Sequence, residues 1–171
     1  MPRGTAELLQ VGEVVRPHGV AGEVKVAVAP EYLDAFLEGI SRVYLGPQQK
    51  PHAVLNARPH QGALLLLLEG IQSRNQAELL RGAPVFIRIA DLPPLPEGAY
   101  YVHELLGLQV YDQDTGALLG ELAEVLATGS NDVYVVRRPG GRELLLPALE
   151  SVVLLVDLDA GVMRVRVPPG L

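Results

Sequence analysis

The sequence predicts an all-β fold in which two small β-barrels are joined by a proline-rich linker. Three observations lead to this prediction. Short apolar runs bounded by Gly, Pro or Asn recur along the chain, as in proteins made of many short strands. Three prolines fall within four positions near the middle, at Pro93, Pro94 and Pro96. The 171 residues are thereby divided into segments of about 90 and 75 residues, each long enough for a small domain.

The first segment is expected to form one barrel of short strands. Its clearest strand is Gly22–Val28, where valines alternate with charged residues and therefore share one face. Other short apolar runs predict the remaining strands: Leu8–Val15, Arg42–Leu45, Ala53–Ala57, Leu64–Leu68 and Val85–Ile89.

Two stretches of this segment predict helical structure instead. Glu31–Leu37 has the pattern of a helical turn. Ser73 and Gln76 have the spacing of a capping box, and Gly82 provides a stop. A short helix is therefore expected between Ser73 and Gly82.

The second segment repeats the strand pattern, with strongly marked turns between the runs. In its last run Met163, Val165 and Val167 share one face, while Arg164 and Arg166 share the other. A shift of one residue in register would bury both guanidinium groups, so the register is well specified. A second small barrel is predicted from five runs: Leu108–Tyr111, Ala117–Leu126, Asp132–Arg137, Arg142–Leu146 and Val162–Val167.

The proline run predicts a stiff linker, because proline fixes φ and removes a backbone donor. We therefore expect a first domain over residues 1–92, a linker over 93–100 and a second domain over 101–171.

Composition excludes several classes of protein. Without cysteine the chain has no disulfides, thiolate metal sites or cysteine nucleophile. Its longest purely apolar stretch, Ala63–Leu68, is far shorter than the roughly 20 residues that span a bilayer, and its start lacks the apolar core of a signal peptide. We expect a cytoplasmic protein with no membrane contact.

The charge is distributed unevenly. Residues 1–92 carry nine basic and nine acidic side chains, whereas residues 93–171 carry five basic and eleven acidic ones. An acidic second domain is poorly suited to grip RNA and better suited to a basic protein partner. The alternative is that these acids only keep the domain soluble.

Residues suited to catalysis are not grouped in any known pattern. The four histidines lack metal-ligand spacing, and no serine stands in a nucleophile elbow. The pairs Asp112 with Asp114 and Asp157 with Asp159 flank turns, where Asp commonly bonds its own backbone. We therefore predict a binding protein with no catalytic residue, no metal and no cofactor.

Two segments call for more than a structural explanation. Around the Pro17–Gly19 loop, Arg16, His18 and Lys25 can all face an anionic partner, although a plain hairpin would also account for the turn residues.

The second of these segments, Gly98–Gly107, contains Tyr100 and Tyr101. Neighbouring residues of an extended chain face opposite ways, so we expect one tyrosine to pack and the other to be exposed. An exposed tyrosine is a common interface anchor, while the alternative is that both serve only the core and the linker.

At these segments the chain resembles the RimM family of bacterial ribosome maturation factors, also called 16S rRNA processing proteins. The order of the matching pieces over most of the chain is specific. Val102-His103-Glu104 departs from the family, which often has an aromatic residue followed by His-Asp. The pieces are Val11–Val26, Gly70–Gly82, Tyr100–Gly107, Leu119–Leu122, Thr128–Asp132, Glu143–Pro147, Val156–Leu158 and Pro168–Leu171.

The resemblance implies an N-terminal six-stranded barrel similar to the second domain of translation elongation factors, followed by a PRC-type barrel. It implies a non-enzymatic assembly factor that helps the head of the small (30S) ribosomal subunit mature, supports 16S rRNA processing and binds ribosomal protein S nineteen. The paired tyrosines attach such proteins to the subunit, which points to Tyr100 and Tyr101 here.

Two rival functions stay open at this point. One is a direct rRNA-binding module of the translation-factor barrel type, against which the near-neutral first domain argues. The other is an enzyme with a hidden site at His18 or His103. Within the assembly-factor reading, we expect a monomer whose Arg16, His18 and Lys25 contact rRNA or a neighbouring protein of the subunit.

Overall fold

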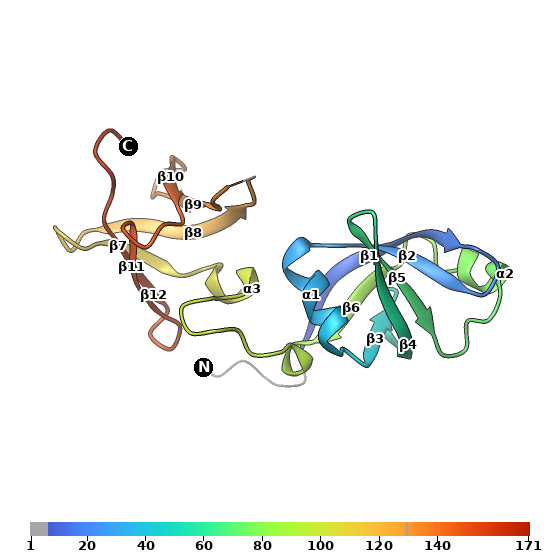
Figure 1. Cartoon of the computed structure of the whole chain (residues 1–171). Coiled ribbons are helices and arrows are strands. Elements are labelled where there is room, and N and C mark those ends of the chain that lie inside the picture. Colours follow the sequence, from blue (N-terminus) through green and yellow to red (C-terminus); the bar gives the residue numbers. More distant parts are fainter. Residues whose placement is uncertain (1–6, 129) are drawn as a thin grey trace. The chain divides into compact units, whose positions relative to one another are not determined.

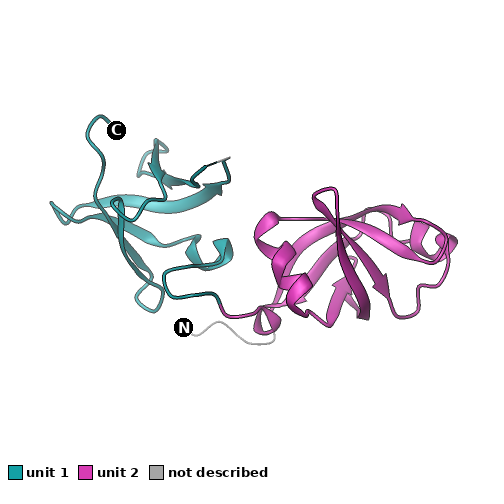
Figure 2. Cartoon of the chain, in the orientation of Figure 1, with its two compact units in different colours: residues 1–2, 95–171 teal, residues 3–94 magenta. Residues whose placement is uncertain are grey.

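The computed structural model describes residues 7–128 and 130–171 of the chain. It is dominated by β-strands, as predicted (Figure 1). The described residues up to Pro94 form one compact unit and Leu95–Leu171 the other (Figure 2).

The first unit is a closed barrel of six strands in the order β1-β2-β5-β4-β3-β6. Every neighbouring pair is antiparallel, and the pairing of β1 with β6 closes the barrel. The expected barrel is confirmed. Its strands are β1 (Leu8–His18), β2 (Glu23–Val28), β3 (Arg42–Leu45), β4 (Lys50–His60), β5 (Ala63–Leu68) and β6 (Pro84–Arg88).

Alternation along the strands directs the apolar side chains inward. Val24 and Val26 of β2 are fully buried, as the pattern of that strand predicted. On β5 even the outward-facing Leu65 is buried. Its cross-strand partners are Lys25 and Arg58, so long polar side chains flank it on the outside of the barrel.

Both predicted helical stretches of this unit are present. Helix α1 (Pro30–Glu38) buries Tyr32, Ala35 and Phe36. Helix α2 (Arg74–Glu78) begins after Ser73, whose Oγ accepts a bond of 3.2 Å from the Gln76 N–H. In a capping box the Gln76 side chain would accept from the N–H of Ser73. Here Gln76 Oε1 accepts instead from the N–H of Gln72, one residue earlier, at 2.7 Å. A short 3-10 turn, η1 (Ile89–Asp91), follows the last strand.

The second unit is a six-stranded sheet in the order β10-β9-β8-β7-β12-β11, in which only β12 and β7 are parallel. One cluster of buried aliphatic residues forms its core, with Val110, Leu122, Leu146 and Met163 at its centre. The strands are β7 (Gln109–Asp112), β8 (Leu118–Leu126), β9 (Val133–Arg137), β10 (Glu143–Pro147), β11 (Val153–Asp157) and β12 (Val162–Val165).

All five predicted strands of this unit are found, and the alternation in the last one is confirmed. Met163 and Val165 are buried, while Arg164 and Arg166 are exposed. Two elements were not predicted. Strand β11 has only four consecutive apolar residues, Val153–Val156, a shorter run than that of β5, and they show no period-two alternation. The four-residue helix α3 (Val102–Leu105) is too short to show a helical period.

Candidate functional site

The tyrosine pair lies where the chain turns from the proline run into helix α3. The Ala99 N–H donates to the Pro96 carbonyl at 3.0 Å, and Gly98 adopts a φ of 85°. Tyr101 is the residue directly before the helix, and Leu105 at the end of the helix belongs to the core. A fixed turn therefore carries both tyrosines.

The expectation that one tyrosine would be exposed is wrong. Tyr101 is only 7% exposed, and Tyr100 is half-buried and packs against the core of the second unit. Neighbouring side chains face opposite ways only in an extended chain. Because the backbone turns into α3 directly after Tyr101, both rings are covered.

Tyr101 is held by the first turn of the helix. Its N–H donates to Glu104 Oε1 at 3.1 Å, and its carbonyl accepts from the Glu104 N–H at 3.0 Å. Its ring stacks on that of His103, with centroids 5.8 Å apart and planes inclined by 21°. These contacts give Tyr101 one orientation.

Tyr100 lines a hollow of about 270 Å³ between the turn and the edge strand β11. Tyr134 lies across this hollow, and Leu149, Leu154 and Leu155 contribute partly exposed apolar surface. Burial, and less strongly the charge of Asp132, raise the pKa of the Tyr134 phenol. Glu150 is the charged residue in the lining. The hollow can therefore accept an apolar anchor from a basic partner.

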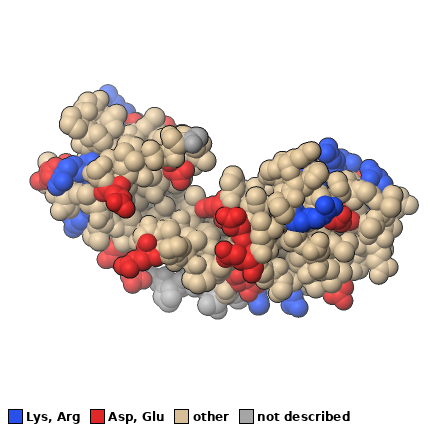
Figure 3. All heavy atoms as spheres, in the orientation of Figure 1, with Lys and Arg blue, Asp and Glu red and all other residues tan. Residues whose placement is uncertain are grey.

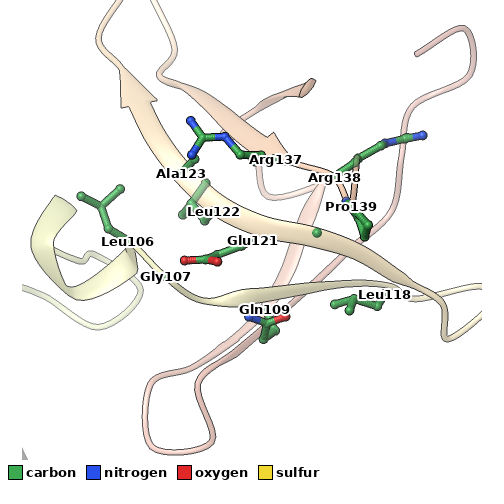
Figure 4. A pocket seen from close by; sticks show the side chains of 11 residues that line it. Leu106, Gly107, Gln109, Leu118, Glu121, Leu122, Ala123, Arg137, Arg138 and Pro139 are labelled. Atoms are coloured by element: carbon green, nitrogen blue, oxygen red, sulfur yellow. The ribbon is translucent and has the colours of Figure 1, made fainter. Parts of the chain in front are cut away.

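A second hollow of about 460 Å³ lies at the other end of α3 (Figure 4). Gln109, Glu121 and Arg137 form a row of cross-strand partners along it. Gly120 allows the close approach of β9, because a Cβ there would lie 2.2 Å from the Arg137 carbonyl oxygen. Both signs of charge occur in the lining, so this hollow shows no preference for one class of ligand.

Arg16, His18 and Lys25 share one face of the barrel, but Pro17 and His18 belong to β1, so the turn begins at Gly19 rather than at Pro17. Arg16 pairs with Lys25 and His18 with Glu23 in the register of β1 and β2, so all four side chains point outward. Glu23, which was not among the predicted site residues, thus lies on the same face as the predicted cations.

Two further residues reach this face from β4, and sequence reasoning did not find them. Arg58 donates two bonds to Glu23, from Nη2 to Oε1 at 3.0 Å and from Nε to Oε2 at 3.1 Å. These bonds lower the pKa of the Glu23 carboxyl, against a smaller opposing effect of burial. The His60 ring lies 5.0 Å from that of His18. No local pattern could reveal these contacts, because β2 and β4 come close only through their common pairing with β5.

The pairs of aspartates serve turns, as the analysis of the sequence proposed. Asp112 Oδ1 accepts from the Asp114 N–H at 3.3 Å, and Asp157 Oδ1 accepts from the Ala160 N–H at 3.0 Å. Across residues 7–128 and 130–171, no group of three or more His, Asp or Glu side chains is arranged to hold a metal ion. Nor does any helix in these ranges have the length and apolarity to cross a membrane.

Comparison with known families matches both units. The family described as RimM N-terminal domain matches residues 9–92, and that described as RimM PRC barrel domain matches residues 102–171. The ribosome maturation factor RimM of Moorella thermoacetica is 41% identical over 173 residues, covering 96% of this chain and 97% of the relative. That of Desulfitobacterium hafniense is 45% identical over 163 residues, covering 94% and 93%.

Two solved structures are also similar in sequence. A 16S ribosomal RNA processing protein RimM from Pseudomonas aeruginosa is 35% identical, with 96% of this chain and 100% of that chain covered and a TM-score of 0.47. The N-terminal domain of RimM from Thermus thermophilus is 28% identical, with 52% and 98% covered and a TM-score of 0.44.

A six-stranded closed barrel followed by a PRC barrel defines a class of two-domain, all-β proteins. Within that class, the chain belongs to the RimM family, since the two family matches together cover most of its length.

Proposed function

We propose that this protein is a non-enzymatic, cytoplasmic assembly factor for the head of the small ribosomal subunit that supports 16S rRNA processing. Its relatives named ribosome maturation factor RimM support this proposal. The proposal needs no metal, cofactor or nucleophile. The working form is a monomer with domains at residues 1–92 and 101–171 and a linker at 93–100.

The partner of the second domain is ribosomal protein S nineteen, held at the tyrosine pair. The observation that carries this assignment is the hollow of about 270 Å³ that Tyr100 lines, in a half of the chain with eleven acidic and five basic residues. A basic ribosomal protein complements that charge, and an apolar side chain can enter the hollow. Tyr100 supplies the contact surface, while the buried Tyr101 positions it by fixing the turn.

The protein then assists maturation of the subunit head because it binds some conformations of the head more tightly than others. A factor that binds one immature conformation of the subunit head more tightly than its competitors shifts the population toward that conformation. Release must follow once the mature contacts form, so an affinity in the micromolar to nanomolar range is expected, about −8 to −12 kcal/mol. The first domain contributes a second contact through Arg16, His18 and Lys25, with rRNA or a neighbouring protein.

The test is a calorimetric titration of the full-length protein with isolated ribosomal protein S nineteen. Wild type should bind one-to-one, and Tyr100→Ala should lose at least about 2 kcal/mol, roughly thirtyfold. Tyr111→Ala is the matched control, because Tyr111 is a half-buried tyrosine of the same unit that does not line the hollow. Circular dichroism checks that each variant is folded.

A second variant keeps the test decisive if Tyr100→Ala does not fold. Leu154→Ser changes a partly exposed residue in the lining of the hollow and leaves the core intact, so it should also weaken binding. Absence of wild-type binding, or unchanged binding by both variants, would reject the assignment of the partner to this hollow.

A further inference from the structure

The outer face of the N-terminal barrel carries two positive charges that the described protein does not neutralise. Arg16 and Lys25 stand directly opposite each other on β1 and β2. Like charges in this position destabilise a sheet. Among the described residues neither side chain forms an ion pair within 4.0 Å, so their repulsion is not relieved from within the unit.

A carboxylate on the same face is already engaged. Glu23 lies two residues before Lys25 on β2 and accepts two hydrogen bonds from the Arg58 guanidinium group. Interaction with His18 and His60 also lowers the pKa of the Glu23 carboxyl. Both rings therefore lie close enough to Glu23 to interact with it electrostatically. Since Arg58 cancels the charge of Glu23, the face keeps its positive excess.

Two imidazole rings complete the face. His18 and His60 approach with ring centroids 5.0 Å apart and planes inclined by 60°. Both are half-buried, and an imidazole N–H can donate to a phosphate oxygen. The four side chains Arg16, Lys25, His18 and His60 therefore present donors from three strands on one surface.

The β1–β2 hairpin that carries most of this face is held in place at β1 and at its turn. Arg74 Nη1 donates to the Gly19 carbonyl at 2.9 Å, and Arg81 Nη1 donates to the Val15 carbonyl at 3.3 Å. Gly22, with φ of 100°, lies so close to Ile71 that a Cβ would stand 2.4 Å from the Ile71 carbonyl oxygen. A rigid loop loses little conformational entropy when it binds.

We propose that this face, hereafter the β1–β2–β4 face, binds the phosphate backbone of RNA, and that Arg58 is a positioning residue that neutralises Glu23. The inference rests on the proposed function, which brings the protein to the ribosomal subunit, and it deepens that proposal by assigning RNA phosphates to this face. Figure 3 shows Lys and Arg atoms along the upper right of this unit and Asp and Glu atoms along its α1 side.

RNA fits this face better than an acidic protein does. Protein interfaces are usually centred on a buried aromatic or Arg anchor in an apolar pocket. On this face the rings are imidazoles, and the other charged groups are cationic except for Glu23, which is bonded to Arg58. Tyr32 and Phe36 of the same unit are buried residues of α1. Phosphates are bound by spread-out Arg, Lys and His donors without such an anchor.

The test is fluorescence anisotropy of the full-length protein with a labelled transcript of the head domain of 16S rRNA at several salt concentrations. Arg16→Ala/Lys25→Ala should weaken binding at least about tenfold at low salt and reduce the slope of log K against log salt by roughly 1 to 2, because two phosphate contacts are lost. Arg42→Ala/Lys50→Ala removes the same charge from exposed positions on β3 and β4 outside the face, and should change binding about threefold or less.

The role of Arg58 has its own readout. Arg58→Ala should weaken RNA binding, because it leaves the Glu23 carboxylate uncompensated beside the phosphates. Adding Glu23→Gln in that background should restore most of the affinity, a rescue that loss of structure alone would not give. His18→Gln/His60→Gln removes both imidazole rings from the face and should weaken binding several-fold.

Equal losses in the Arg16/Lys25 and Arg42/Lys50 variants would overturn the proposal, since binding would then follow overall charge. Undiminished RNA binding by Arg16→Ala/Lys25→Ala, with reduced binding to isolated subunit proteins, would assign the face to a protein instead. The titration with ribosomal protein S nineteen contains no RNA, so failure of this proposal can be separated from failure of the proposed function.

Discussion

Arg58 and Glu23 are separated by 35 positions in the sequence, yet they form a two-point ion pair across the outside of the N-terminal barrel, with contacts of 3.0 and 3.1 Å. Strand β5 lies between the strands that carry them, and Lys25 and Arg58 are both cross-strand partners of Leu65 on it. The Arg58–Glu23 pair thus spans β5 and ties the N-terminal hairpin to β4.

This ion pair makes the stability of the barrel depend on pH in one direction. The pKa of Glu23 is lowered from 4.5 in the folded protein, first by its bonds to Arg58. Its contribution is therefore complete above pH 4.5 and is lost as pH falls through the lower folded value. Glu23→Gln should reduce Tm at pH 7 by no more than about 4 °C, because exposed pairs stabilise little, and the difference from wild type should vanish at low pH.

Thermal unfolding at pH 7 and pH 3, followed by circular dichroism, measures this difference. Glu69→Gln is the control, because Glu69 is exposed and its carboxylate forms no ion pair among the described residues. A difference for Glu23→Gln that grows as the pH is lowered would contradict the assigned sign.

Gly22 is expected to tolerate no other residue. A Cβ there would meet the Ile71 carbonyl oxygen at 2.4 Å, and the φ of 100° is itself unfavourable for an L-residue. Gly22→Ala should therefore lower the free energy of unfolding by about 2 to 4 kcal/mol, measured by urea denaturation. Gly19→Ala, in the same loop with φ of 70° and no atom within 4 Å, should cost only about 1 kcal/mol. Equal costs would show that the close approach to Ile71 is unimportant.

Neighbouring leucines on β10 should differ sharply in their contribution to the second unit. Leu146 is fully buried in the core, whereas Leu145 is 48% exposed. Leu146→Ala should cost about 2 to 5 kcal/mol because it leaves a cavity, and Leu145→Ala less than about 1 kcal/mol. Denaturation monitored by hydrogen exchange of β9 and β10 amides compares them. A similar loss in both variants would mean that the register of β10 is wrong.

The Ser73 cap of helix α2 should contribute measurably to the stability of the barrel. Ser73→Ala removes the oxygen that accepts from the Gln76 N–H, and should cost about 1 kcal/mol of barrel stability. Ser73→Asp keeps an acceptor and is expected to stay close to wild type. If alanine and aspartate at this position unfold at the same urea concentration, the cap is not contributing.

Local patterns were enough to predict most elements of both units. Alternating Val24 and Val26 marked β2, and alternating Met163 and Val165 marked β12, because burial on one face of a strand imposes a period of two. The same reasoning failed for β11, an edge strand whose apolar residues do not alternate, and for the single turn of α3.

The tyrosine pair shows how a short-range argument can mislead. The sequence singled out this segment, and the assumption of an extended chain predicted that one ring would be exposed to solvent. The backbone turns into the four-residue helix α3, whose Glu104 side chain accepts from the Tyr101 N–H. As a result Tyr101 is buried and Tyr100 is half-buried. No periodicity reveals an element of this length, since one helical turn contains too few residues to repeat a pattern.

The all-β class, the barrel strands and the common outward face of Arg16 and Lys25 could be predicted from the sequence, because they depend on neighbours along the chain and on one hairpin register. The bonds between Arg58 and Glu23 and the approach of His60 to His18 became visible only in the folded barrel. These contacts arise because β2 and β4 both pair with β5, and pairings between distant segments leave no periodic signal in the sequence.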